Sequence, residues 1–91
     1  MATLIDELWS LSDGAHRYTK CAGYRIGVTR ARDIRGEVDG FHLMVWPEGN
    51  VRFVARRLWM SELTGKDSDA LSAVVSEEGK RGERLGLWEA V

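Results

Sequence analysis

The clearest pattern along the chain is an amphipathic stretch near its N-terminus. Between residues 3 and 12, apolar side chains recur at helical spacing on one wide face. Thr3 and Asp6 resemble a capping box with the shorter acid, and Gly14 is a plausible stop residue. The pattern therefore predicts an N-terminal helix. Its apolar positions are Leu4, Ile5, Leu8, Trp9 and Leu11.

An extended segment and a loop are predicted next. Residues 18–29 alternate between apolar and polar positions, which is typical of a strand, and Ala22-Gly23 and Gly27 indicate a bend or bulge within it. Residues 30–40 combine two glycines with mixed charges and have no stable period, so they predict a loop.

A β-hairpin is predicted over residues 41–57, where apolar segments flank Pro47 and Gly49. Pro47 suits the first central position of a type I turn, and Gly49 suits the left-handed residue that closes a three-residue loop. Directly opposed residues share a sheet face, so this loop predicts one apolar face and one face that mixes aromatic and basic groups. The predicted apolar pairs are Val45–Val51, Leu43–Phe53 and Phe41–Ala55. The mixed face would carry His42, Met44, Trp46, Arg52, Val54 and Arg56.

The positions of the arginines favour a hairpin loop of three residues. A loop of two or four residues would place Arg52 and Arg56 among the apolar side chains, and an unpaired buried charge costs several kcal/mol. The three-residue loop avoids this cost.

Helical segments are expected after the hairpin. Residues 58–65 can form one helical turn, and residues 67–79 predict a longer helix that begins at Asp67 or Ser68 and ends at Gly79. The following GKRGERLG lacks the features of a phosphate-binding loop and is interpreted as a linker. The apolar tail is expected to dock as a short strand or turn.

These elements predict an α+β fold in which residues 1–91 form a single domain. Its expected architecture is a small antiparallel sheet of three to four strands with N-terminal and C-terminal helices packed on one face. A chain of 91 residues is at the lower end of domain sizes, and two smaller units would each lack a core.

Composition places the chain among ordinary globular proteins. Hydrophobic residues make up 44% and charged residues 30%, which excludes the composition of a disordered chain. Cys21 is the only cysteine, so no internal disulfide can form, and the N-terminus lacks the pattern of a signal peptide. No apolar run approaches a membrane span. We therefore expect a cytoplasmic protein without membrane association.

The net charge of −1 hides an uneven distribution. Residues 1–16 carry three acids and no base, residues 17–57 carry nine bases against four acids, and residues 58–91 carry seven acids against four bases. A basic centre can mark a binding face, or it can be neutralised by acidic flanking helices in the same molecule. Both interpretations stay open.

Catalytic and metal chemistry find little support. Cys21, His16, His42 and Asp39 are the candidate catalytic groups, but nothing in their spacing brings the thiol to either imidazole. A zinc site usually needs four paired Cys and His ligands, and the chain offers three such residues in total. We expect no catalytic residue, no cofactor and no metal, and hence no enzyme.

The sequence favours a small protein-interaction module, such as an inhibitor or adaptor from a bacterium or mobile element, that docks another protein or complex. Arginine and tryptophan often dominate binding energy, so the mixed hairpin face and the Arg-rich loop are the predicted site. The predicted partner-binding residues are Arg30, Arg32, Arg35, His42, Trp46, Arg52 and Arg56.

Three alternatives accompany this hypothesis. The first is a nucleic-acid-binding accessory protein that uses the same face, since the element order also occurs in double-stranded-RNA-binding domains. The acidic start of the second helix and the net charge of −1 disfavour it. The second is a solvated or helix-covered face without a binding role. The third is an unrecognised small enzyme that would lose activity on Cys21→Ser or His42→Ala. Homodimerisation through an unpaired edge strand would be compatible with each of these.

Overall fold

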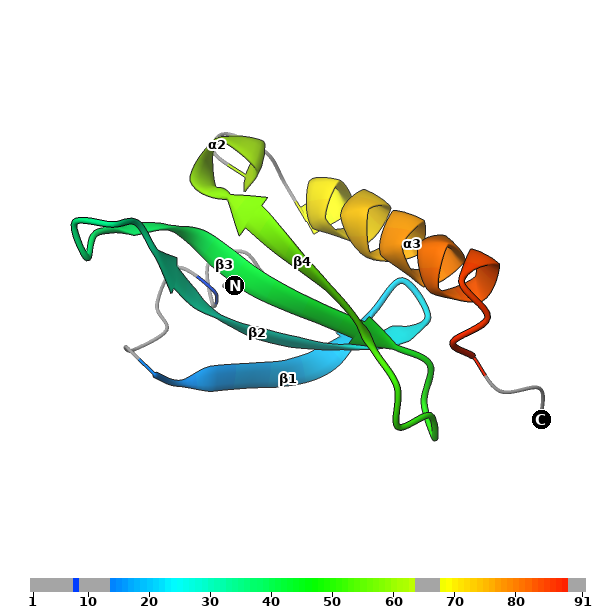
Figure 1. The fold of residues 1–91 in the computed structure, drawn as a ribbon. Coiled ribbons are helices and arrows are strands. Elements are labelled where there is room, and N and C mark those ends of the chain that lie inside the picture. Colours follow the sequence, from blue (N-terminus) through cyan, green and yellow to red (C-terminus); the bar gives the residue numbers. More distant parts are fainter. Residues whose placement is uncertain (1–7, 9–13, 64–67, 89–91) are drawn as a thin grey trace.

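The computed structural model describes residue 8, residues 14–63 and residues 68–88, and the described chain folds as α+β (Figure 1). Its strands form one antiparallel sheet in the order β1-β2-β3-β4. The elements are β1 (His16–Cys21), β2 (Tyr24–Arg32), β3 (Val38–Trp46), β4 (Val54–Trp59), α2 (Met60–Leu63) and α3 (Ser68–Arg84). The predicted antiparallel sheet and C-terminal helix are confirmed. The helix predicted for residues 3–12 lies outside the described residues except for Leu8, which is fully buried.

The prediction of one strand over residues 18–29 was wrong, because the chain reverses completely at Ala22-Gly23. These two residues have φ values of 51° and 83°. Consecutive positive φ values are what a two-residue type I′ hairpin turn requires. Cys21 therefore pairs with Tyr24, and the expected bend is the junction of β1 and β2.

The loop predicted for residues 30–40 was also wrong at both ends. β2 continues to Arg32 and β3 begins at Val38, which leaves a short turn. In this turn the Asp33 carboxylate accepts hydrogen bonds from the backbone N–H groups of Arg35 (2.8 Å) and Glu37 (3.0 Å). A register shift beside Ala31 and Arg32 disturbs the alternation, and this explains why the sequence shows no strand period there.

The register predicted for the β3–β4 hairpin was wrong. A turn forms one residue later than predicted, because the Asn50 N–H bonds the Pro47 carbonyl at 3.1 Å and Gly49 has a φ of 83°. Pro47 is thus the first residue of the turn and not its first central residue. However, residues 47–53 all lie outside the strands. Compared with the prediction, β4 is displaced by three residues, and an odd displacement exchanges its two faces. The observed pairs include Phe41–Leu58, Leu43–Arg56 and Val45–Val54.

The sheet has one covered face and one open face. We call the face under α3 the inner face and the opposite one the outer face (Figure 1). Apolar side chains of α3, including Leu71 and Val75, pack on the inner face together with Leu63 and Leu8. The sheet contributes Ile26, Val28, Phe41, Leu43, Val45, Val54 and Leu58 to this core.

Helix α3 does not end at Gly79 as predicted but continues through Gly82 to Arg84. Both glycines are sites of close packing. A Cβ atom at Gly79 would lie 2.2 Å from the Tyr24 ring, and one at Gly82 would lie 2.1 Å from the Trp88 ring. The Trp88 indole N–H also donates a 2.8 Å hydrogen bond to the Gly79 carbonyl.

The end of α3 is a Schellman motif centred on Gly86. Gly86 has a φ of 70°, its N–H bonds the Glu83 carbonyl, and the Leu87 N–H bonds the Gly82 carbonyl, each at 3.0 Å. Leu87 and Trp88 then pack against the core, which confirms that this part of the tail docks as a turn.

These contacts predict that Gly82→Ala destabilises the protein, although the same change in an exposed helix stabilises by about 1 kcal/mol. The added methyl group must displace the Trp88 ring from the helix. In a Trp88→Ala background the space is open, so Gly82→Ala should become stabilising. Urea denaturation of the four proteins measures this sign reversal, and a stabilising Gly82→Ala in the wild-type background would contradict it.

Candidate functional site

Strand pairing arranges the outer face in rows that run across the sheet. The central row is Tyr18, Gly27, Met44 and Ala55. On one side of it lies the row Lys20, Arg25 and Trp46. On the other side lie the row His16, Thr29, His42 and Arg57, followed by Ala31, Gly40 and Trp59.

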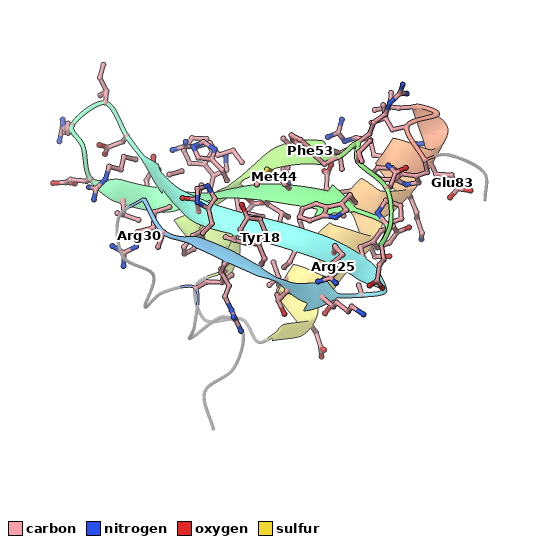
Figure 2. All side chains as sticks on the ribbon, turned by 90° about the horizontal axis from the view of Figure 1, so that it is seen from below. Tyr18, Arg25, Arg30, Met44, Phe53 and Glu83 are labelled. Atoms are coloured by element: carbon pink, nitrogen blue, oxygen red, sulfur yellow. The ribbon has the colours of Figure 1, made fainter. Side chains whose placement is uncertain are left out.

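The centre of the outer face is apolar and open to solvent. Tyr18 and Met44 close over Gly27, where a Cβ atom would lie 3.0 Å from a side-chain carbon of each. Trp46 meets Tyr18 edge to face with ring centroids 6.5 Å apart. Phe53 lies in the loop before β4, and Figure 2, which looks onto the outer face, labels it together with Tyr18 and Met44. We call Tyr18, Met44, Trp46 and Phe53 the central patch.

The exposure of this patch is unusual for single-sided sheets. Tyr18 is 57% exposed and Phe53 is 50% exposed, and Trp59 at the far end of the face is also 50% exposed. The solvated face of an antiparallel sheet is normally polar. Grouped apolar side chains on a solvated face are a mark of interaction surfaces.

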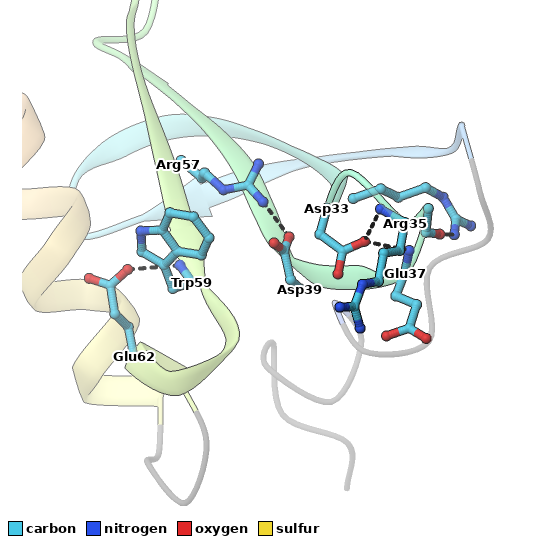
Figure 3. Close-up of polar contacts among 9 residues, drawn as sticks. Asp33, Arg35, Glu37, Asp39, Arg57, Trp59 and Glu62 are labelled. Atoms are coloured by element: carbon cyan, nitrogen blue, oxygen red, sulfur yellow. Dashed lines mark hydrogen bonds and ion pairs between the residues drawn. The ribbon is translucent and has the colours of Figure 1, made fainter.

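At the end of the face beside residues 33–37, which we call the turn end, acids and bases are equal in number and an ion pair forms between two of them (Figure 3). The Arg57 guanidinium donates to the Asp39 carboxylate and lies 4.3 Å from the Trp59 ring centroid. In the adjoining turn, the Arg32 side chain donates to the Gly36 carbonyl. Overall three arginines (Arg32, Arg35 and Arg57) face three acids (Asp33, Glu37 and Asp39), so this end is electrically balanced.

At the opposite end, which we call the loop end because residues 47–53 lie there, positive charge is in excess. Lys20 and Arg25 each lie 3.2 Å from a Glu48 carboxylate oxygen. The Lys20 hydrogen bond and charge, followed by those of Arg25, hold the pKa of Glu48 below its usual value. Arg52 adds a further exposed cation in the same loop. The described residues of this end therefore include three bases and one acid.

The structure brings only part of the predicted site together. His42 and Trp46 lie on the outer face, Arg52 lies in the loop, and Arg35 is exposed in the turn between β2 and β3. The Arg32 side chain donates a hydrogen bond to the Gly36 carbonyl of the same turn. The predicted position of Arg56 on the outer face was wrong. Arg30 and Arg56 pair with Phe41 and Leu43 respectively, so both start from the inner face.

The cost of placing the Arg56 charge on the inner face is offset by an ion pair with a neighbouring carboxylate. The Arg56 guanidinium forms this ion pair with Glu62 of α2, and both side chains are about two-thirds buried. A second oxygen of Glu62 accepts the Trp59 N–H at 2.8 Å, which holds the start of α2. Arg56 is therefore part of the packing between sheet and helix.

Sequence reasoning misses Tyr18, Lys20, Arg25 and Arg57 as members of the outer face. The first three depend on the reversal at Ala22-Gly23, for which alanine is a weak signal because it rarely adopts positive φ. Arg57 depends on the β4 register. The one available signal was that Arg56 and Arg57 are adjacent, so a strand must send one to each face.

The groups considered for catalysis lie apart. Cys21 pairs with Tyr24 at the end of β1, and its sulfur lies 3.7 Å from the Ser72 hydroxyl of α3. His16 and His42 belong to the outer row, and His16 stacks on Tyr18 at 5.8 Å. Among the residues that the structure describes, no three His, Cys, Asp or Glu side chains gather as metal ligands.

Comparison with protein-family models, curated proteins and solved structures found no match to this chain. In the described part of the chain, no helix is both long and apolar enough to cross a membrane.

The different environments of Arg56 and Arg52 give a stability prediction. Arg56→Glu places two carboxylates together on the inner face and should lower the free energy of unfolding by about 1–3 kcal/mol. Arg52→Glu, which makes the same charge change in the exposed loop, should stay within about 0.5 kcal/mol of wild type. Urea denaturation followed by tryptophan fluorescence compares them. Equal losses would contradict the observed register, and the exchange Arg56→Glu/Glu62→Arg should recover part of the stability.

The loop end gives a pH prediction. Glu48 should titrate in the folded protein below its unfolded pKa, so its small contribution to stability is present above the unfolded pKa and disappears as pH falls through the folded one. Lys20→Met should raise the pKa of Glu48 more than Arg25→Met does, because Lys20 supplies the larger effects. Side-chain carboxyl NMR measures both shifts, and an unshifted Glu48 in the wild type would show that these ion pairs do not persist in solution.

Proposed function

We propose that this chain is a protein-interaction module, an inhibitor or adaptor rather than an enzyme, that docks a partner protein through the outer face of its sheet. The observation that carries the proposal is the central patch. Its aromatic and thioether side chains stand on the uncovered face of a sheet whose inner face already supplies the core. An apolar centre with a polar rim is the usual anatomy of a protein interface.

The chemistry of the patch suits tight docking. Tyrosine and tryptophan are frequent among the residues that dominate binding energy, and methionine adapts its shape to a partner surface. Tyr18 belongs to β1, and Met44 and Trp46 belong to β3 on the other side of β2. Trp46 meets Tyr18 edge to face, and Tyr18 and Met44 both lie over Gly27. Such a preorganised surface loses little conformational freedom on binding.

Nucleic acid is the second candidate, because bases could stack on Tyr18, Trp46 or Trp59. Binding to a phosphate backbone depends on neutralising many phosphates. On the outer face, however, Arg57 is paired with Asp39, and Lys20 and Arg25 share Glu48. Arg57 is therefore neutralised, and Lys20 and Arg25 share one acid, so few cations of the face are left to neutralise phosphates and the charge arrangement favours a protein partner.

A pair of matched variants tests the proposal. Tyr18→Asp/Met44→Asp places two acids in the central patch, whereas Ala73→Asp/Leu85→Asp makes the same kind of change at exposed positions of the helical layer. The partner should be enriched from the source cells by the wild type and the helical variant, and it should bind the patch variant at least about 100-fold more weakly. Quantitative mass spectrometry identifies it, and calorimetry with the purified partner measures the affinity.

Two results would overturn the assignment. Equal retention of the same partner by both variants, with native NMR spectra for each, would remove the outer face as the docking site. Saturable binding of a single-stranded oligonucleotide that weakens steeply between about 50 and 200 mM salt would favour nucleic acid instead.

A further inference from the structure

The outer face carries its charge asymmetrically along the strands. The turn end is balanced, since Arg57 has Asp39 and the remaining charges of that turn cancel. At the loop end Lys20 and Arg25 share the single carboxylate of Glu48, and the loop adds the exposed cation Arg52, so the described residues of this end carry three bases and one acid. The central patch lies between these ends. A partner that covers the whole face therefore meets apolar side chains and, on one side of them only, more bases than acids.

We propose that the outer face binds an acidic, apolar segment of the partner protein, with the carboxylates over the loop end and the apolar side chains over the central patch. This rests on the proposed function and specifies its ligand. The rows of Lys20 and Tyr18 are two residues apart along β1, which is about 7 Å in a strand. An extended segment with an apolar side chain at one position and a carboxylate two positions later matches this spacing.

Arginine makes the loop end selective for carboxylates. The planar guanidinium of Arg25 or Arg52 can bind a carboxylate through two parallel hydrogen bonds. Within the chain Glu48 already binds cations of this end, with one oxygen on Arg25 and the other on Lys20. A carboxylate of the partner could bind the cations of this end in the same way that Glu48 binds Lys20 and Arg25.

A second copy of this chain is a poorer occupant of the face. Its own outer face has an electrically balanced end and a cationic end, so stacking two such faces leaves the positive charge of each loop end uncovered or opposed to another. A polyanion such as a nucleic acid also fits poorly, because the excess positive charge is confined to one end.

Synthetic peptides test the assignment directly. The probe is a blocked nine-residue peptide with Trp-Leu-Phe at its centre and three glutamates on each side, and its control replaces every glutamate by lysine. In amide NMR titrations the acidic peptide should shift outer-face resonances of β1, β2 and β3 and bind at least about 10-fold more tightly than the lysine peptide.

Charge variants locate the site. Lys20→Gln/Arg52→Gln should weaken the acidic peptide about 3- to 10-fold, whereas Lys80→Gln/Arg84→Gln, which removes the same charge from the helical layer, should leave its affinity unchanged. Equal affinity for the two peptides, equal effects of the two variants, or no saturable binding of the acidic peptide would each overturn the inference. Shifts of the same resonances by an oligothymidine but not by the acidic peptide would assign the face to nucleic acid.

The two proposals fail separately. If partner binding is lost in Tyr18→Asp/Met44→Asp but is unchanged in Lys20→Gln/Arg52→Gln, the outer face still docks a protein and only its acidic character is wrong. If binding is unchanged in both, the proposed function itself is wrong.

Discussion

The β3–β4 register is the constraint on which the rest of the structure depends. Arg56 and Arg57 are adjacent, so every register sends one arginine to the inner face. The observed register sends Arg56 inward with Val54 and Leu58, and both of these become buried. Full burial of such side chains contributes about 1.5–3 kcal/mol each. Glu62 supplies the acid that keeps Arg56 from being an unpaired buried charge.

The same register decides what the outer face contains. With Arg56 inward, Arg57 faces outward, where the register shift beside Ala31 and Arg32 leaves Asp39 available to it. Each of the two adjacent arginines thus has its own acid, one from α2 and one from β3. Arg56 and Arg57 therefore stabilise the fold through ion pairs. The bases in excess are at the loop end, where Lys20 and Arg25 share Glu48 and Arg52 lies in the loop.

Local patterns predicted the type of fold better than they predicted pairing. The antiparallel sheet, a turn near residues 47–50 and the helix that starts near Ser68 were all evident from alternation, proline and glycine positions, and helical spacing. The length of α3 could not be predicted in this way. In a sequence, a glycine that ends a helix cannot be distinguished from a glycine that makes room for an aromatic ring. Tyr24 and Trp88, which fill the space at Gly79 and Gly82, are identified only by the tertiary structure.

The residues of the candidate site could be predicted only where local alternation along one strand was sufficient to place them. Trp46 and His42 follow from the alternation of β3 alone, whereas membership of Tyr18 and Lys20 requires that β1 be recognised as a separate strand. The arginine positions require the strand register, which in turn depends on an ion pair to a helix outside the hairpin. The cost of burying an unpaired charge does govern the register. However, Arg56 can be buried because Glu62 pairs with it, and if Arg56 faced outward, its neighbour Arg57 would be buried instead.

Structural roles account for some aromatic residues of the outer face and not for others. Trp59 covers the Arg57 guanidinium, and Trp46 and Tyr18 pack edge to face, so these three aromatic residues have contacts within the fold, whereas no such ring contact involves Phe53 among the described residues. Phe53 lies beyond the strand, half exposed, and more than half of Tyr18 is open to water. Polar residues at these two positions would leave the inner core untouched, since neither side chain belongs to it. This exposed apolar surface is the observation on which the proposed docking function depends, and the neighbouring bases Lys20 and Arg25 are the reason for proposing an acidic partner segment.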